Sequence, residues 1–212
     1  MGEFIGKGRK ARRCYGFDEV SLVPGDVTIN PNEVDTSWEI DGKKFRVPII
    51  AAAMDGVVDV DFAVKMSKLG GLAVLNLEGV QTRYENPSKV LDKIASASPE
   101  EATTLVQDVY LEPIKEKLIS QRIEEIKKGK GIAAVSTIPQ KAERYGAIAE
   151  EAGCDLFVVQ STVTTAKHLS KEYKILDFRQ FCKKMKLPVI IGNSVTYKAT
   201  LDLLDTGASA LL

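Results

Sequence analysis

The chain has 212 residues, of which 44% are hydrophobic and 27% are charged, so it is able to bury a core and is neither disordered nor fibrous. Its 29 basic and 29 acidic residues give a formal net charge of zero, which disfavours nucleic acid and anionic membranes as partners. No apolar run approaches the roughly 18 residues of a spanning helix, and the first twenty residues contain no apolar block typical of a secretory signal. We therefore expect a cytoplasmic protein.

Residues 1–46 are rich in glycine, proline, asparagine and single charges, a composition that predicts an extended arm with a small hairpin at Asp41 and Gly42. The arm carries five basic residues among the seven from Lys7 to Arg13. Because the chain has no net charge, a solvated basic arm is favoured over a phosphate-binding one.

From residue 47 onward the sequence repeats one pattern: a short apolar run, then an amphipathic helical pattern, then a glycine. This repetition indicates βα units. The runs are apolar nearly throughout, as strands covered on both faces are. Predicted strands lie at 47–53, 72–77, 131–135, 156–159, 188–192 and 208–212.

Apolar stripes predict helices over 62–69, 111–126 and 142–152. Pro87 and Pro99 are placed like the first-turn prolines of two short helices between residues 86 and 110. Three glycines mark the helix ends at which the backbone takes a positive φ, namely Gly70, Gly153 and Gly207.

Consecutive βα units fit either an open doubly wound sheet or part of a closed (β/α)8 barrel. A barrel of about 250 residues uses roughly 31 per unit, so residues 47–212 make between five and six units. The open alternative lacks the dinucleotide-binding G-x-G-x-x-G after the first strand, where the sequence reads AAAMD.

Polar or small residues stand at the carboxyl ends of successive predicted strands, which meet at one rim in a parallel α/β fold. Amides and hydroxyls dominate, and the carboxylates form no pair, so the rim suits hydrogen bonding to a heterocycle or ribose better than acid–base hydrolysis. The set comprises Met54, Asp55, Asn76, Glu78, Ser136, Thr137, Gln160, Ser161, Thr162 and Asn193.

Other reactive side chains fit a site less well. The single histidine, His168, is expected in an exposed or capping role at the opening of a helix beyond the rim. Cys154 precedes the fourth strand, at the end of the sheet opposite the rim, where a nucleophile would be poorly placed. Cys182 falls in a helical pattern and is expected to be a buried thiol. The cysteines, odd in number and far apart, disfavour disulfides and a zinc site, so we expect no bound metal in this chain.

Several stretches resemble the IMP dehydrogenase/GMP reductase family: YGFDEVSLVP at 15–24, AAAMDGV at 51–57, LGGLAVLN at 69–76, FVVQST at 157–162 and PVIIGN at 188–193. The segments GKGRKARR at 6–13 and NLEG at 76–79 look most like the IMP-dehydrogenase-related branch without CBS domains, and the connection between the second and third strands is too short for a CBS pair. The resemblance implies the N-terminal portion of a TIM barrel, about five and a half βα units, at residues 47–212.

By the same resemblance, the full-length protein is expected to oxidise IMP to XMP with NAD in guanine nucleotide biosynthesis, as a homotetramer. A monovalent cation such as K⁺ is a further expected cofactor. Met54 matches a family position that contacts the substrate purine or ribose, and Asn193 matches the asparagine near the substrate after the fifth strand. Gln160 stands where dehydrogenases carry an aspartate that holds the nicotinamide ribose, and Ser161 and Thr162 follow at cofactor positions.

Two departures from the family pattern keep alternatives open. Gln160 replaces the charged aspartate, and Ala52 stands where many members have a serine. GMP reductase with NADPH, a non-catalytic purine-nucleotide-binding paralogue and an unrelated phosphate-binding barrel remain the alternatives. In the family, the nucleophilic cysteine follows the sixth strand, which places it after Leu212, so the 212 residues alone are expected to be inactive.

Overall fold

The structure, a computed structural model, describes residues 3–212 and divides into two separate units. The first unit ends at Asp35 and contains an antiparallel hairpin, β1 (Glu3–Gly6) and β2 (Arg9–Ala11), and two short 3₁₀ helices, η1 (Phe17–Glu19) and η2 (Pro31–Glu33). The rest of this unit is irregular, and none of its residues whose burial is described is buried. This unit is thus mostly irregular and exposed, and it ends at Asp35, eleven residues before the predicted boundary at residue 46.

The second unit begins at Thr36 and includes the hairpin of β3 (Trp38–Ile40) and β4 (Lys43–Phe45), which composition alone had grouped with the arm in residues 1–46. Its predicted turn is confirmed, because Asp41 and Gly42 have φ values of 44° and 79°. Positive φ at both central residues matches the right-handed twist of the flanking strands.

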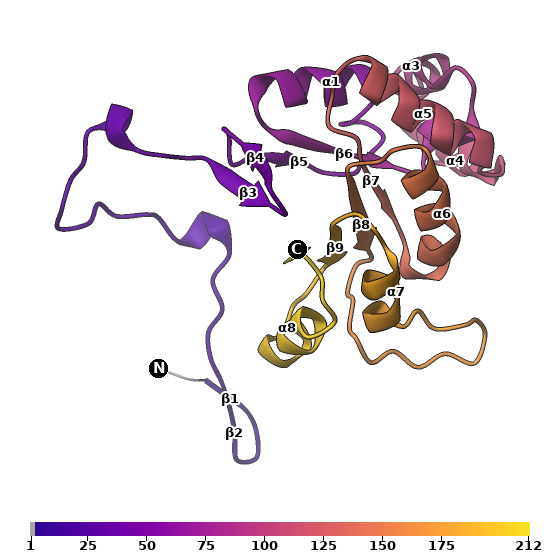
Figure 1. Ribbon diagram of the computed structural model, residues 1–212. Coiled ribbons are helices and arrows are strands. Elements are labelled where there is room, and N and C mark those ends of the chain that lie inside the picture. Colours follow the sequence, from indigo (N-terminus) through magenta and orange to yellow (C-terminus); the bar gives the residue numbers. More distant parts are fainter. Residues whose placement is uncertain (1–2) are drawn as a thin grey trace. The chain divides into compact units, whose positions relative to one another are not determined.

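Six parallel strands form one curled sheet in which each strand pairs with the next one along the chain (Figure 1). An open doubly wound sheet would reverse its strand order at a switch point, whereas the order here runs without reversal from β10 to β5. The predicted barrel portion is therefore confirmed. The strands are β5 (Ile50–Ala51), β6 (Leu72–Asn76), β7 (Ala134–Thr137), β8 (Leu156–Gln160), β9 (Val189–Gly192) and β10 (Ala210–Leu211).

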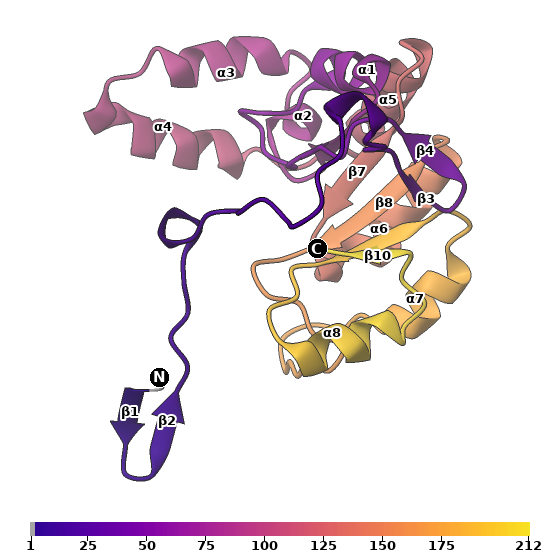
Figure 2. The same cartoon turned by 90° about the vertical axis from the view of Figure 1, so that its left-hand side faces the viewer.

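The helices follow the strands along the chain, and the three glycines predicted to end helices all have positive φ. Helices α3 and α4 begin at Pro87 and Pro99, as predicted, and project away from the sheet (Figure 2). The helices are α1 (Val60–Leu69), α2 (Val80–Arg83), α3 (Pro87–Ala95), α4 (Pro99–Leu111), α5 (Glu116–Lys128), α6 (Pro139–Glu151), α7 (Phe178–Lys184) and α8 (Tyr197–Leu204). Within residues 3–212, no helix is long and apolar enough to cross a membrane.

The single helix predicted over 111–126 is wrong. Helix α4 ends at Leu111 and α5 begins at Glu116, with Glu112 at φ −59° and ψ 129°, outside the helical region. Pro113 explains the break, because a proline disfavours the helical conformation of the preceding residue.

Two apolar clusters cover the two faces of the sheet, and alternation along each strand assigns its residues to them. In β6, Ala73 and Leu75 belong to the cluster that also contains Ile119 and Ile123 of α5. Leu72 and Val74 face the opposite way, into a cluster with residues of the β3–β4 hairpin; its buried members are Ile40, Phe45, Leu72, Val74, Ala134, Leu156, Val158 and Ile190. The hairpin thus fills the inner face of the curl.

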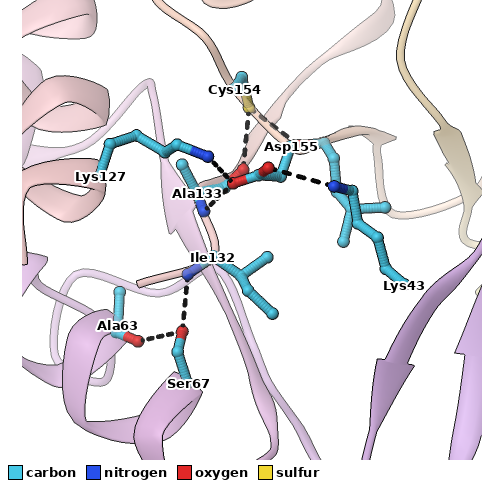
Figure 3. A network of polar contacts seen from close by, with 9 residues as sticks. Lys43, Ala63, Ser67, Lys127, Ile132, Ala133, Cys154 and Asp155 are labelled. Atoms are coloured by element: carbon cyan, nitrogen blue, oxygen red, sulfur yellow. Dashed lines mark hydrogen bonds and ion pairs between the residues drawn. The ribbon is translucent and has the colours of Figure 1, made fainter. Parts of the chain in front are cut away.

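A polar network centred on Asp155 lies at the amino end of the sheet, just before β8 (Figure 3). Its carboxylate accepts hydrogen bonds from Lys127 of α5 at 2.7 Å, from the backbone N–H of Ala133 at 2.9 Å and from Lys43 of the hairpin at 3.2 Å. One side chain therefore joins the hairpin, helix α5 and the entry to β7. The amino end of the sheet therefore carries a structural ion-pair network.

Candidate functional site

The rim residues named from the sequence stand at or just after the carboxyl ends of five parallel strands, β5 to β9. Met54 follows β5, Gln160 ends β8, and Asn193 follows β9. Since β8 and β9 are neighbours, the structure brings Gln160, Ser161 and Asn193 together, whereas β6 and β7 separate Met54 from them along the rim.

Hydrogen bonds join the ends of β8 and β9. The side-chain amide of Gln160 donates to Asn193 Oδ1 at 3.1 Å. The Ser161 backbone N–H donates to Gly192 O at 2.9 Å, and the Ser161 carbonyl oxygen accepts from the Asn193 N–H at 3.0 Å. The two amide side chains are therefore held side by side at the rim.

Thr164 belongs to this arrangement but was not found from the sequence. Its buried hydroxyl lies 2.9 Å from Ser161 Oγ and donates to Gly192 O at 2.5 Å. No spacing rule identifies it, because the contact with Gly192 forms only when the chain after β8 folds back across the end of β9. Thr164 thus ties the chain after β8 to the end of β9.

The Met54 side of the rim is a tight turn. Met54 is 58% exposed, and its carbonyl oxygen accepts from the backbone N–H groups of Val57 and Val58, both at 2.9 Å. Its neighbour Asp55 accepts from the backbone N–H of Val80 at 2.8 Å and from the hydroxyl of Tyr110. Met54 therefore presents an apolar side chain to solvent from a fixed turn.

The second rim carboxylate has structural partners. Glu78 Oε1 accepts from the Thr137 hydroxyl at 2.9 Å and from the Ile138 backbone N–H at 2.7 Å. Glu78 Oε2 pairs with Lys141 at 2.7 Å. This carboxylate connects the end of β6 to the start of α6, and neither it nor Asp55 forms an acid–base pair with another carboxylate.

A pocket opens between the start of α6 and the chain that follows β8. Hydroxyl, amide and aromatic groups line it, including Gln140, Ser161, Thr165, His168, Tyr173 and Phe178. His168 Nε2 lies 2.7 Å from the Tyr173 hydroxyl, and the two rings stack at a centroid distance of 5.9 Å. The pocket continues the rim outward from Ser161.

The prediction of a helix opening at His168 is wrong, although the side chain is exposed as expected. Residues 161–177 contain no helix. Side-chain hydroxyls bond to the local backbone instead, with Ser161 Oγ donating to Val163 O at 2.9 Å and Thr165 Oγ1 to Lys167 O at 3.0 Å. Such bonds compete with helical ones and favour turns.

Neither cysteine of the second unit stands at the rim. Cys154 is buried at the amino end of β8, where burial raises the pKa of its thiol to about 12 and its Sγ lies 3.1 Å from the carbonyl oxygens of Ala133 and Leu156. Cys182 lies on α7, where burial also raises its pKa, and Cys14 lies in the first unit. Within residues 3–212, no cluster of three His, Cys, Asp or Glu side chains could hold a metal ion.

Sequentially ordered parallel strands, outer helices and a polar rim at the carboxyl ends define a protein of the (β/α)8-barrel class, of which these residues form a portion. A family model described as the IMP dehydrogenase / GMP reductase domain matches residues 14–212, and the chain belongs to this family.

Similar proteins agree with this assignment. The chain is 32% identical over 213 residues to an uncharacterized oxidoreductase of Mycobacterium bovis, covering 98% of this chain and 57% of that protein. It is 31% identical over 106 residues to the inosine-5'-monophosphate dehydrogenase of Methanocaldococcus jannaschii, covering 46% of this chain and 21% of that enzyme. An IMP dehydrogenase/GMP reductase-like protein from Corynebacterium glutamicum superposes with a TM-score of 0.90 at 33% identity, covering 98% of this chain and 56% of that one. The chain thus spans little more than half the length of the mycobacterial relative.

Proposed function

We propose that the protein oxidises IMP to XMP with NAD, in the synthesis of guanine nucleotides. The observation that carries the proposal is the paired amides of Gln160 and Asn193 at the carboxyl rim, 3.1 Å apart. Neutral amides and hydroxyls recognise the edges of a purine or the hydroxyls of a ribose by hydrogen bonding. Membership of the IMP dehydrogenase / GMP reductase family supports the oxidoreductase class.

We assign the substrate to the space between Met54, after β5, and Asn193, after β9. Met54 offers an exposed thioether and methyl group that can pack against a purine face, because methionine makes favourable contacts with aromatic rings. Asn193 offers an amide from the end of β9, held in place by Gln160. Together they supply one apolar contact and one directional hydrogen-bonding group.

The neighbouring residues fit a nicotinamide cofactor. Gln160 donates its amide N–H to Asn193, and its carbonyl oxygen can accept from a ribose hydroxyl. The Ser161 hydroxyl lines the pocket beside α6, and Thr162 is exposed next to it. When bound, NAD supplies the acceptor for the hydride that leaves the purine. An uncharged glutamine binds a hydroxyl less strongly than a carboxylate does, so weaker cofactor binding is expected than with aspartate at this position.

The reaction also needs a thiolate that adds to the purine and a base that activates water. Cys154 cannot provide the thiolate, because it is buried at the opposite end of the sheet with a raised pKa. Glu78 is engaged by Thr137, Ile138 and Lys141. We therefore expect these 212 residues by themselves to bind the nucleotide without producing NADH.

The proposal is tested by assaying the protein purified from its natural source with IMP plus NAD, and separately with GMP plus NADPH. We expect NADH to form in the first assay and NADPH to be unchanged in the second. NADPH consumption with GMP would assign the protein to GMP reduction instead. Nucleotide binding without turnover in either assay would identify a non-catalytic purine-binding member of the family.

A further inference from the structure

Helices α3 and α4 form a helical hairpin that contributes little to the core. Helix α3 (Pro87–Ala95) has no buried residue, and within α4 (Pro99–Leu111) only Val109 is buried. Figure 2 shows both helices projecting from the body of the second unit. The pair is attached to the rest of the unit through the packing of α3 and α4 on α2 and through contacts at the end of α4.

Polar groups around α2 hold that end of α4. The Tyr84 hydroxyl donates to Val109 O at 3.0 Å, and the Arg83 guanidinium donates to Glu112 O. The same guanidinium lies 5.3 Å from the centre of the Tyr110 ring. These contacts place the Tyr110 ring beside the Arg83 side chain at the end of α2.

From this position, the Tyr110 hydroxyl reaches across to the rim and donates to Asp55 Oδ2, which also accepts from the Val80 backbone N–H at 2.8 Å. A Cβ on Gly79 would collide with Asp55 Oδ1. Only glycine therefore allows the carboxylate to approach the start of α2 this closely. Asp55 is held by α4 on one side and by α2 on the other.

Asp55 directly follows Met54. In this turn the Met54 carbonyl oxygen accepts hydrogen bonds from the backbone N–H groups of Val57 and Val58. Because Met54 and Asp55 share a peptide bond, we expect the anchored Asp55 carboxylate to fix the backbone from which the Met54 side chain projects. Burial, together with the adjacent Asp55, raises the pKa of Tyr110, so its hydroxyl remains protonated and able to donate at neutral pH.

We propose that Tyr110 is a positioning residue for the substrate, acting through Asp55 to set the place of Met54 at the rim. The helical hairpin α3–α4 thereby gains a functional contact with the nucleotide site although it lies outside the core. The effect on substrate rests on the proposed function, because it requires that Met54 contact the purine nucleotide. The effect on the turn does not.

The test compares Tyr110→Phe with Tyr84→Phe in the chain labelled with ¹³C at the methionine methyl groups. Both variants lose one hydroxyl at the same end of α4, but only Tyr110 bonds Asp55. We expect the Met54 methyl resonance to move in Tyr110→Phe and to stay in place in Tyr84→Phe, with Met66 and Met185, which pack against the core, as unchanged references. An unmoved Met54 resonance in Tyr110→Phe, or an equal shift in Tyr84→Phe, would overturn the proposal.

A second variant, Asp55→Asn, tests the route of the effect. If Tyr110 acts through Asp55, the double variant Tyr110→Phe/Asp55→Asn should show the same Met54 shift as Asp55→Asn alone. Additive shifts would mean that Tyr110 acts on the turn by another path and would contradict the proposal.

Titration with IMP separates the two proposals. In the wild-type chain IMP should shift the Met54 methyl resonance, and in Tyr110→Phe the apparent Kd should rise several-fold. Equal Kd values, despite a moved Met54 resonance in the free variant, would refute the substrate-positioning role. If IMP leaves the wild-type resonance unchanged, the proposed substrate is wrong, while the ligand-free comparison still decides whether Tyr110 sets the turn.

Discussion

The Asp155 carboxylate accepts hydrogen bonds from three separate elements of the fold. Burial alone would raise its pKa, but the hydrogen bonds from Lys127, the Ala133 backbone and Lys43 outweigh burial and lower the pKa. The ionised form is therefore favoured by folding. Because the hairpin, helix α5 and the start of β7 all depend on it, its removal should be felt across the amino end of the sheet.

We predict that Asp155→Asn lowers the free energy of unfolding by about 2 kcal/mol at pH 7, the scale of lost hydrogen bonds to a charged group. The matched control is Glu39→Gln, which neutralises a carboxylate in an exposed pair with Lys44 at 3.9 Å and should change stability by less than about 0.5 kcal/mol. Urea denaturation measures both. Equal losses would show that the Asp155 network adds no more stability than a surface pair.

The same network predicts a pH dependence. A carboxyl whose pKa is lower in the folded state stabilises the fold above its unfolded pKa, about 3.9 for aspartate, and loses that contribution as the pH falls through the folded value. The stability difference between wild type and Asp155→Asn should be constant from neutral pH down to about pH 5 and should shrink below about pH 4. A difference that persists undiminished at about pH 3 would contradict an ionic origin.

At the scale of elements, the short β3–β4 hairpin fills the inner face of the sheet with two buried side chains, Ile40 and Phe45. Phe45, which is 1% exposed, stacks on Trp38 at a centroid distance of 4.3 Å and packs in the inner cluster with Leu72 and Ile190. Such a short hairpin is not stable by itself, so its fold depends on the sheet it fills.

We predict that Phe45→Ala destabilises the chain by about 3–5 kcal/mol, because it removes a buried aromatic ring from the inner cluster. Lys44→Ala, the adjacent position with an exposed side chain, is the control and should change stability by less than about 0.5 kcal/mol. Thermal or urea unfolding monitored by circular dichroism measures the difference. A small effect of Phe45→Ala would mean that the sheet keeps its curl without the hairpin.

Elements were predictable from the sequence where local pattern determines them. Apolar runs identified all six strands of the sheet, and the first-turn prolines located α3 and α4. Two predictions of a helix failed. Pro113 interrupts the apolar stripe of residues 111–126, and in residues 161–177 side-chain hydroxyls bond to the local backbone in turns.

The candidate site was predictable only in part. Strand ends placed Met54, Gln160 and Asn193 on one rim, since parallel strands deliver their last residues to the same edge. Thr164 and Tyr110 were missed because they join the site through tertiary contacts, and Tyr110 lies 55 residues from Asp55 in sequence. A hydrophobic period in the sequence gives no information about a contact between residues so far apart.

At the scale of the whole molecule, the first unit is distinguished by its exposed apolar side chains. They include Val20, Leu22, Val23, Val27 and Ile29, each more than half exposed. Several large apolar side chains exposed within ten residues are available for a protein–protein contact. We propose that the arm contributes to a homotetramer.

Deletion of residues 1–35, which form a separate unit, tests that proposal by light scattering after size-exclusion chromatography. We expect the parent protein to be a tetramer and the truncated one to have a smaller assembly mass while retaining its circular dichroism spectrum. An unchanged mass would show that the arm is not part of the assembly.

The central claim is that the carboxyl rim of the curled sheet binds a purine nucleotide, and calorimetric titration with IMP tests it most directly. We predict one IMP site per chain, with Kd about tenfold higher in Asn193→Ala, the scale of one lost hydrogen bond. Kd should be unchanged in Asn32→Ala, an exposed asparagine of the arm. Absence of IMP binding, or an identical Kd in Asn193→Ala, would contradict the claim.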